Sequence, residues 1–328
     1  MVDSSGRQIN YMRISITDRC NLRCKYCMPD GIETVPMSEI LTFEEIIEIV
    51  RAAAGLGISK IKITGGEPLV RKGCANLVKM IKDVHGIAEV TLTTNGILLE
   101  DELPALKNAG IDGINVSLDT LNRKDYEKLT GVDGLEKVIS GIEMSLKYGI
   151  KTKINVVSIK HKEKVFSDDC IRLIELARNT ALDIRFIEIM PIGNGKKFDL
   201  LGNDILFHEI TTRYPAMEKD NTSHGNGPAV YYKIPGFMGS IGFISALHGK
   251  FCDSCNRIRL SSKGYLKACL CYDSGEDLMP IIRKHSEGDK SKLLQETMAN
   301  VIYNKPVSHC FEEKEKITED NYMTSIGG

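Results

Sequence analysis

Three cysteines fall within eight residues near the beginning of the chain, in CNLRCKYC (20–27). Cys20, Cys24 and Cys27 follow the spacing Cys-x3-Cys-x2-Cys. Three thiolates suit the soft irons of a [4Fe–4S] cluster and leave the fourth iron without a protein ligand. A zinc site completed by a distant side chain is the alternative, but structural zinc sites are usually closed and often use paired Cys-x2-Cys units. The spacing therefore favours an iron–sulfur cluster with one open coordination position.

A second group of three cysteines lies in FCDSCNRIRLSSKGYLKAC (251–269). Cys252, Cys255 and Cys269 again provide three thiolates, one short of a closed four-cysteine site. A zinc ribbon with two Cys-x2-Cys pairs is close in spacing and stays open as the alternative. The isolated cysteines are expected to be small core residues: Cys74, Cys170 and Cys310.

Two arginines follow directly after the second cysteine pair. Arg257 and Arg259 lie two apart on a predicted strand, so both side chains point to one face. Two guanidinium groups on one face beside a metal centre suit bidentate binding of phosphates. A solvated strand edge is the alternative.

The elements that must position these residues alternate between strand and helix signals over the first 190 residues. Thr42 and Glu45 have capping-box spacing at the start of a helix that ends at Gly55 or Gly57. The repeat predicts βαβ units with parallel strands, and loops at the carboxyl ends of such strands build active sites. Periodicity alone leaves a doubly wound sheet and a partial barrel both open. The predicted strands are 12–17, 60–64, 90–96, 113–119, 151–157 and 183–190.

After residue 190 the pattern changes. Residues 193–227 are predicted to be loop with one short helix, and VYYKIP and GSIGFIS are predicted to be strands. RIRLS and YLKACLC form a predicted hairpin around Lys263–Gly264, followed by helices at about 276–286 and 289–303. The predicted domains are therefore 1–195 and 196–328.

Composition limits the classes of protein. The chain of 328 residues has 43 Lys and Arg against 44 Asp and Glu, so no nucleic-acid partner follows from its charge. No apolar run approaches the ~18 residues of a membrane span, and the polar first ten residues lack the apolar core of a signal peptide. A cytosolic location is expected, where thiols stay reduced, so the ten cysteines are better explained as metal ligands than as disulfides.

CNLRCKYC resembles the signature of the radical S-adenosylmethionine enzymes. The resemblance implies that the open iron binds the amino and carboxylate groups of S-adenosylmethionine. An electron from the cluster then cleaves the sulfonium C–S bond, and the resulting 5′-deoxyadenosyl radical abstracts hydrogen from substrate. It also implies a partial (β/α)6 TIM-type barrel instead of an open sheet, with a C-terminal extension that carries a second cluster.

The same resemblance implies contacts to S-adenosylmethionine. Gly66, in TGGEP (64–68), matches the stretch that holds the methionine amino group, although a plain tight turn needs glycine equally. Tyr26 matches an aromatic contact near adenine. Ser117 and Met190 match further cofactor contacts, although core packing would by itself explain a methionine.

Nearly the whole chain resembles one subfamily, the GTP 3′,8-cyclases, known also as molybdenum cofactor biosynthesis protein A. The resemblance rests on RISITDRCNLRCKYCMP, TGGEPL, TTNG, VSLD, FCDSCNRIRL, GYLKACL and the final Gly-Gly. It implies that the second open iron binds the guanine base. Many members carry an arginine where this chain has Lys62, and a lysine keeps the charge but loses the bidentate fork. The implied GTP contacts are Arg13, Lys62, Thr93, Lys153, Arg257 and Arg259.

The subfamily's reaction removes hydrogen from C3′ of GTP and joins C3′ to C8 of guanine. This lyase reaction yields 3′,8-cyclo-7,8-dihydro-GTP, the first intermediate of molybdopterin biosynthesis. The implied partners are cyclic pyranopterin monophosphate synthase, which acts next, a flavodoxin- or ferredoxin-type electron donor, and a second copy in a homodimer. Two other interpretations stay open: a different radical enzyme such as a peptide-modifying maturase, and a non-enzymatic electron carrier or zinc-stabilised binding protein.

Two details of the C-terminal part are expected from the subfamily pattern. Its spacing selects Cys269 as the third ligand of the second cluster, so Cys271 is predicted to be a free thiol in a small apolar space. If both cysteines were ligands, the site would be closed like a zinc ribbon. The resemblance implies that the terminal Gly327 and Gly328 reach into the active site, where no bulkier residue would fit, and a frayed chain end is the alternative.

Overall fold

The computed structural model describes residues 1–31, 35–159, 168–199, 201–284, 286–319 and 321–323. Within these ranges, one sheet of twelve strands runs through the molecule in the order β12-β11-β10-β1-β2-β3-β4-β5-β6-β9-β8-β7. Its centre is formed by six neighbouring parallel strands: β1 (Tyr11–Ser15), β2 (Lys60–Thr64), β3 (Glu89–Thr94), β4 (Gly113–Ser117), β5 (Lys151–Ser158) and β6 (Asp183–Glu188).

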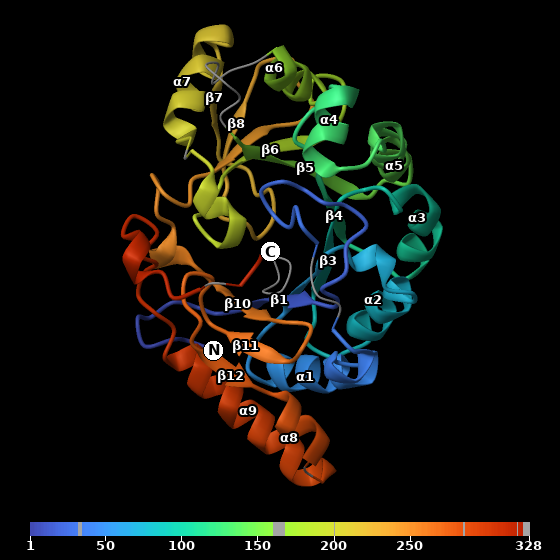
Figure 1. The fold of residues 1–328 in the computed structure, drawn as a ribbon, viewed down its shortest axis with the longest axis vertical. Helices are drawn as coiled ribbons and strands as arrows, with labels where there is room; N and C mark the ends of the chain where they lie inside the picture. Colours follow the sequence, from blue (N-terminus) through green and yellow to red (C-terminus); the bar gives the residue numbers. More distant parts are fainter. Residues whose placement is uncertain (32–34, 160–167, 200, 285, 320, 324–328) are drawn as a thin grey trace.

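Helices connect these strands and cover the outer face of the curved sheet (Figure 1). This arrangement confirms the predicted partial barrel. The connecting helices are α1 (Phe43–Gly55), α2 (Cys74–Lys82), α3 (Leu99–Asn108), α4 (Arg123–Thr130), α5 (Leu135–Lys147) and α6 (Asp168–Glu175).

The helix boundaries follow from local sequence signals. The capping box of α1 is confirmed, because Glu45 N donates to Thr42 Oγ1 (3.2 Å) and Thr42 N donates to Glu45 Oε2 (2.7 Å). Between β4 and β5 the chain forms two helices, α4 and α5. Gly131 ends α4 with φ of 77°, a left-handed conformation that favours glycine.

The residues after 195 extend the same sheet at both ends. At one end β10 (Arg257–Leu260) pairs parallel with β1, and at the other β9 (Ile241–Ile244) pairs parallel with β6. The predicted hairpin is confirmed, since β11 pairs antiparallel with β10. The predicted boundary at residue 195 stays a prediction. The remaining strands are β7 (Glu218–Asp220), β8 (Val230–Lys233), β11 (Tyr265–Lys267) and β12 (Gly275–Asp277).

The remaining helices are short or lie at the periphery. Figure 1 shows α8 and α9 together beyond β11 and β12. Among the described residues, no helix is both long and apolar enough to cross a membrane. The α-helices are α7 (Asn203–Arg213), α8 (Met279–Lys284) and α9 (Glu287–Tyr303), and the 3-10 helices are η1 (Met37–Glu39), η2 (Pro68–Val70), η3 (Gly193–Lys197), η4 (Cys252–Ser254) and η5 (Lys314–Lys316).

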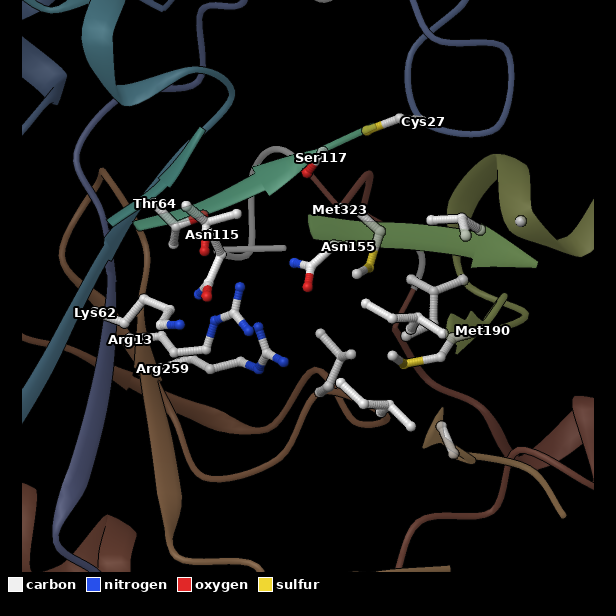
Figure 2. Close-up of a pocket in the computed structure, with 18 of the residues that line it drawn as sticks. Arg13, Cys27, Lys62, Thr64, Asn115, Ser117, Asn155, Met190, Arg259 and Met323 are labelled. Atoms are coloured by element: carbon white, nitrogen blue, oxygen red, sulfur yellow. The ribbon is translucent and has the colours of Figure 1, made fainter. Parts of the chain in front are cut away.

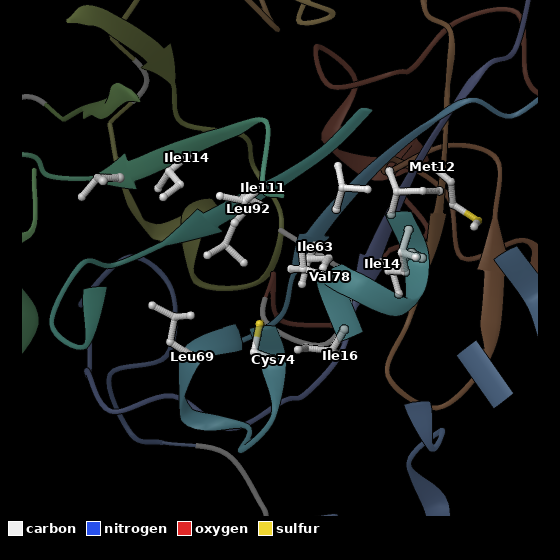
Figure 3. Close-up of a cluster of buried hydrophobic side chains, with 14 of the residues drawn as sticks. Met12, Ile14, Ile16, Ile63, Leu69, Cys74, Val78, Leu92, Ile111 and Ile114 are labelled. Carbon is white, nitrogen blue, oxygen red and sulfur yellow. The ribbon is translucent and has the colours of Figure 1, made fainter. Parts of the chain in front are cut away.

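The pleat of the strands separates core from site. Met12, Ile14 and Ile63 are fully buried and pack with Cys74 and Val78 of α2 in the hydrophobic core (Figure 3). Side chains at the alternate positions point the opposite way, because successive strand residues face opposite sides. Cys74 is thus confirmed as a core residue, and the inner face of the sheet is left for polar side chains.

Candidate active site

The inner face of the sheet surrounds a cavity of about 350 Å³. This volume lies at the lower end of the roughly 300–1,000 Å³ typical of small-molecule sites. Both cysteine groups reach the cavity, because β10 and its flanking loops lie beside β1 in the sheet. The cysteines that line it are Cys20, Cys24 and Cys27, called the first trio, and Cys252, Cys255 and Cys269, called the second trio.

The first trio lies in the loop after β1. Leu22 N (3.4 Å) and Asn95 Nδ2 (3.8 Å) both donate to Cys20 Sγ. Burial raises the pKa of the Cys20 thiol, and burial together with Asp119 raises the pKa of Cys24 well above its ordinary value. Buried thiolates therefore need a cation to stabilise them, and coordinated iron supplies that charge. The donor set fits a [4Fe–4S] cluster.

Gly66 allows the TGGEP turn to pack against the cysteine loop. A Cβ on Gly66 would lie 2.3 Å from the carbonyl oxygen of Arg19 and 2.6 Å from that of Asp18. Its own N–H donates to the carbonyl of Thr17 at 2.7 Å. Glycine is therefore required here for close backbone approach, immediately before Cys20.

Sequence analysis missed Glu67, the next residue of this turn. Its buried carboxylate accepts hydrogen bonds from Leu69 N (3.0 Å), Thr94 Oγ1 (2.7 Å) and Asn95 N (2.6 Å). Burial raises the pKa of Glu67 to about 7. The carboxylate thus joins the ends of β2 and β3, and Asn95 continues the network to Cys20. Its signal in the sequence was an acidic residue between a buried strand and a proline.

The residues expected near S-adenosylmethionine lie round the first trio. Tyr26 donates to Asp119 Oδ2 at 2.8 Å, and Asp119 Oδ1 accepts from Val157 N at 2.7 Å. Asp119, also missed from the sequence, therefore holds Tyr26 in place. Ser117 and Met190 line the same cavity (Figure 2). The structure brings these residues together, and their contacts to a cofactor stay predictions.

A row of basic side chains crosses the inner face at the other end of the cavity. Arg13 is aligned with Arg259 on β10 and with Lys62 on β2. Figure 2 shows these three side chains directed into one space, with Cys27 on the far side. Burial, then the neighbouring arginines, lowers the pKa of Lys62 well below its usual value and that of Arg259 to about 9. Thr93 also lines the cavity.

Arg185 on β6 belongs to the same basic wall and was missed from the sequence. It is buried and lines the cavity. Among the described residues, its Nε and that of Arg257 have no hydrogen-bond partner. Its signal in the sequence was a charged residue in the middle of an apolar strand. Cations that are shielded from water and have unused donors are suited to bind an anion.

Lys153 differs from the other predicted GTP contacts. It is not among the residues that line the cavity. Its Nζ lies 2.9 Å from Asp183 Oδ2, donates to the hydroxyl of Tyr231 (3.1 Å) and contacts the carbonyl of His224. The ion pair with Asp183 occupies the ammonium group, so its contact with GTP stays a prediction.

The second trio comes from η4 and from the chain after β11. Cys255 N donates to the carbonyl of Cys252 (3.1 Å), and His309 N donates to Cys252 Sγ (3.4 Å). Within the described parts of the chain, no three His, Cys, Asp or Glu side chains are grouped round a single ion position. The case for a cluster at the second trio rests on its three thiols at the cavity and on the basic groups beside them.

Cys269 and Cys271 diverge because β11 ends at Lys267. Cys269 lines the cavity, whereas Cys271 is fully buried and its Sγ lies 3.3 Å from that of Cys310. Burial raises the pKa of Cys271 to about 12. This placement supports Cys269 as the ligand, and the assignment stays a prediction. Cys310 is confirmed as a small core residue, because it is buried in an apolar cluster with Cys271.

The C-terminal segment approaches the cavity from β11. Glu319 is fully buried and forms an ion pair with Lys267, and Asn321 N donates to Glu319 Oε1 at 2.8 Å. Met323 lines the cavity (Figure 2). Gly327 and Gly328 lie outside the described residues.

A partial barrel with three cysteines after its first strand, and a glycine turn packed against them, defines a radical S-adenosylmethionine enzyme. The model of the radical SAM superfamily matches residues 14–165, and that of molybdenum cofactor synthesis C matches residues 182–311. The chain belongs to the GTP 3′,8-cyclase family, as its full-length relatives establish.

One relative with that name, from Clostridium perfringens (strain SM101 / Type A), is 42% identical over 329 residues, covering 100% of both chains. Another, from Peptoclostridium acidaminophilum, is 44% identical over 331 residues, covering 100% of this chain and 98% of its own. The crystal structure of Streptococcus suis SuiB shares the fold, with a TM-score of 0.60 at 18% identity, over 92% of this chain and 67% of that one.

The chain is therefore an enzyme, and the electron-carrier and zinc-binding interpretations are set aside. Membership of the radical SAM superfamily implies one [4Fe–4S] cluster and S-adenosylmethionine as cofactors. The names of the full-length relatives favour a GTP cyclase over a peptide-modifying maturase.

Proposed function

We propose that this enzyme cyclises GTP to 3′,8-cyclo-7,8-dihydro-GTP, the first step of molybdenum cofactor biosynthesis. The observation that carries the proposal is the row of half-buried cations, Arg259, Arg13 and Lys62, on the wall of a cavity that both cysteine trios line. A nucleoside triphosphate has the negative charge that such a row needs, and its ribose and base extend away from the phosphates, towards the trios.

The first trio would hold the [4Fe–4S] cluster of the superfamily, and the second trio would hold another. When bound, the first cluster and S-adenosylmethionine would supply the radical chemistry that removes hydrogen from C3′ of the substrate. The thiols of each trio would provide soft ligands for iron, and the missing fourth ligand would leave one iron of each cluster open to a ligand in the cavity.

Residues round the first trio would orient S-adenosylmethionine. Gly66 exposes backbone close to the cluster, Tyr26 is fixed by Asp119, and Ser117 and Met190 contribute to the cavity wall beside them. Asn155, between the two ends of the cavity, has a buried Oδ1 that lacks a hydrogen-bond donor among the described residues. This oxygen would accept a hydrogen bond from a ribose hydroxyl.

The basic wall would hold the triphosphate. Burial and mutual repulsion lower the pKa values of Lys62, Arg13 and Arg259, so an anion bound beside them would stabilise their charged forms. A charge-assisted hydrogen bond contributes about 1.5–3 kcal/mol. Fixing the phosphates at one end would also place the ribose and base at fixed distances from the two trios.

The proposal extends to partners and setting. Cyclic pyranopterin monophosphate synthase would take the product, a flavodoxin- or ferredoxin-type protein would donate electrons, and two copies would form a homodimer in the cytoplasm. Turnover with a reduced flavodoxin or ferredoxin in place of dithionite tests the electron donor. The mass of the protein in solution tests the homodimer.

The central test is turnover under strictly anaerobic conditions. Reconstituted, reduced protein is mixed with S-adenosylmethionine and either GTP, ATP, CTP or UTP, and 5′-deoxyadenosine and the nucleotide product are identified by mass spectrometry. Of the four nucleotides, only GTP should give 5′-deoxyadenosine, together with a product that is an isomer of GTP. Equal 5′-deoxyadenosine from ATP, or none with any nucleotide, would contradict the proposal.

A further inference from the structure

Lys305 places a buried ammonium group beside the second trio. The residue follows the end of α9, is 4% exposed and lines the cavity. Its Nζ donates to the carbonyl of Arg257 at 2.9 Å and also to the carbonyl of Ala268. These carbonyls belong to the two chain segments that carry Cys255 and Cys269, so the ammonium lies between two members of the trio.

No ion pair joins Lys305 to an Asp or Glu among the residues that the structure describes. The other buried lysine of this region, Lys267, has Glu319 as its partner. Lysine is almost never fully buried unless its charge is compensated. The two carbonyls also leave one of the three ammonium donors for a further acceptor.

Cys255 is the anionic group that Lys305 meets. A hydrogen bond joins the Lys305 ammonium to the Cys255 thiol, and Lys305 and then Arg257 are the cations that act on this thiol most strongly. Around the first trio the strongest charged neighbours are carboxylates instead, Glu67 for Cys20 and Asp119 for Cys24. The main charged neighbour of Cys255 is thus a cation, whereas that of each of these two thiols is an anion.

A separate brace holds Lys305 in place. Arg7, which forms a buried ion pair with Asp3 (2.6 Å), donates to the carbonyl of Lys305 (3.2 Å) and to the carbonyl of Cys252 (3.0 Å). The backbone that carries the ammonium and the backbone that carries the first ligand of the trio are thus fixed to one guanidinium. The position of the charge relative to the trio is built into the fold.

We propose that Lys305 is a positioning residue for the second cluster, whose ammonium compensates the negative charge of Cys255 and of the cluster that the trio holds. Positive charge stabilises the reduced, more negative form of a cluster. Lys305 therefore raises the reduction potential of the second cluster. This inference rests on the proposed second cluster.

The test is a redox titration followed by electron paramagnetic resonance, in a Cys24→Ser background from which the first cluster is absent. Lys305→Gln removes the charge and keeps a hydrogen-bond donor for the two carbonyls. In this variant the midpoint potential of the second cluster should fall by at least about 59 mV. For a one-electron couple, this shift lowers the ratio of reduced to oxidised cluster tenfold at a fixed potential. Lys305→Arg should keep the midpoint near that of the background.

The matched control removes an exposed charge from the same region. Lys250 forms an exposed ion pair with Glu312 and also contributes to the field at Cys252. Lys250→Gln should leave the midpoint unchanged, because solvent screens that charge. An unchanged midpoint in Lys305→Gln with a loaded second cluster would overturn the inference.

Iron content separates this inference from the proposed function. About eight irons per unaltered chain would support two clusters. About four would show that the second cluster is absent, and this would overturn the role of Lys305. Loss of iron from the second site alone in Lys305→Gln, with a native circular dichroism spectrum, supports the role. Loss of that spectrum in both Lys305→Gln and Lys305→Met would assign Lys305 to the fold and overturn the proposal.

Discussion

Cys269 and Cys271 are two positions apart, yet they meet different surroundings. Cys269 lines the cavity, while Cys271 is enclosed with Cys310 in an apolar cluster. Arg185 and Lys153 also differ in their surroundings. Arg185 lines the cavity and has an unused Nε donor, whereas Lys153 forms an ion pair with Asp183. At this scale, the partner that a side chain finds decides whether its charge or thiol is available for function.

Replacing each of the two cysteines should identify the ligand. Cys269→Ser should lose about four of about eight irons, whereas Cys271→Ser should keep all of them. Iron and sulfide analysis after anaerobic reconstitution measures both. Loss of iron in Cys271→Ser, or in both variants, would show that the assignment is wrong.

Arg185→Gln should weaken GTP binding without loss of either cluster. Removing one charge-assisted hydrogen bond costs about 1.5–3 kcal/mol, roughly a 10- to 100-fold loss of affinity. Anaerobic isothermal titration calorimetry with GTP measures the change. Arg283→Gln, which removes an arginine that pairs with Glu45 outside the cavity, is the control and should bind normally. Equal affinity in both variants would remove Arg185 from the phosphate site.

At the scale of elements, the carboxyl ends of β2 and β3 are joined through a single buried carboxylate. The Glu67 carboxylate accepts hydrogen bonds from the backbone after β2 and from residues at the end of β3. Gly66 lets the same turn pack against the cysteine loop. The turn thus acts as a spacer that fixes the first trio relative to the sheet. Because Glu67 is buried, its ionisation destabilises this turn.

The stability of the protein should therefore depend on the ionisation of Glu67. Its pKa is about 7 in the folded protein against an ordinary value of 4.5, so the folded state retains a proton that the unfolded chain has released. Ionisation accordingly destabilises the fold as pH rises from about 5 to about 7, by up to about 3 kcal/mol. Urea unfolding across this range, compared with Glu67→Gln, measures the difference.

The Glu67→Gln variant should lack this part of the pH dependence, whatever its absolute stability. The free energy of unfolding of the unaltered protein, minus that of the variant, should decrease between about pH 5 and pH 7. A constant difference over the range would show that the pKa of Glu67 is not raised.

At the scale of the whole molecule, the extension completes what the six-stranded unit leaves open. It adds β10 beside β1 and β9 beside β6, and its last described segment runs from β11 back towards the loop after β6. A Cβ on Gly193 of that loop would lie 3.3 Å from the Cα of Tyr322. The ion pair between Lys267 and Glu319 is thus the anchor that directs Met323 to the cavity.

Breaking this anchor should cost much of the stability of the C-terminal segment. Lys267→Met leaves Glu319 buried without its partner, and removing one member of a buried pair costs about 3–5 kcal/mol. Denaturant unfolding measures the loss, and limited proteolysis tests whether cleavage after residue 305 becomes faster. Replacing both residues, as Lys267→Met with Glu319→Leu, should recover part of the loss.

The exposed pair Lys316–Glu313 is the control for this experiment. Lys316→Met should change stability by only about 0–1 kcal/mol, because exposed pairs contribute little. A similar small effect in Lys267→Met would contradict the role of the buried pair as an anchor.

The sequence by itself determined the repeating strands and helices, the two cysteine trios and the pair Arg257 and Arg259. These features depend on local periodicity and spacing, which are complete within a short stretch of chain. The capping box of α1 and the hairpin of β10 and β11 were predictable for the same reason. The family resemblance then selected the barrel, which periodicity left open.

Only the tertiary structure decided which of these residues share a cavity and with which partners. Arg185 joins Arg13 and Lys62, Glu67 joins two strand ends, and Lys305 meets Cys255, although none of these pairs is close in the chain. The physical reason is that burial and pairing set the availability of a charge or thiol. Both depend on strands that become neighbours only when the sheet is assembled.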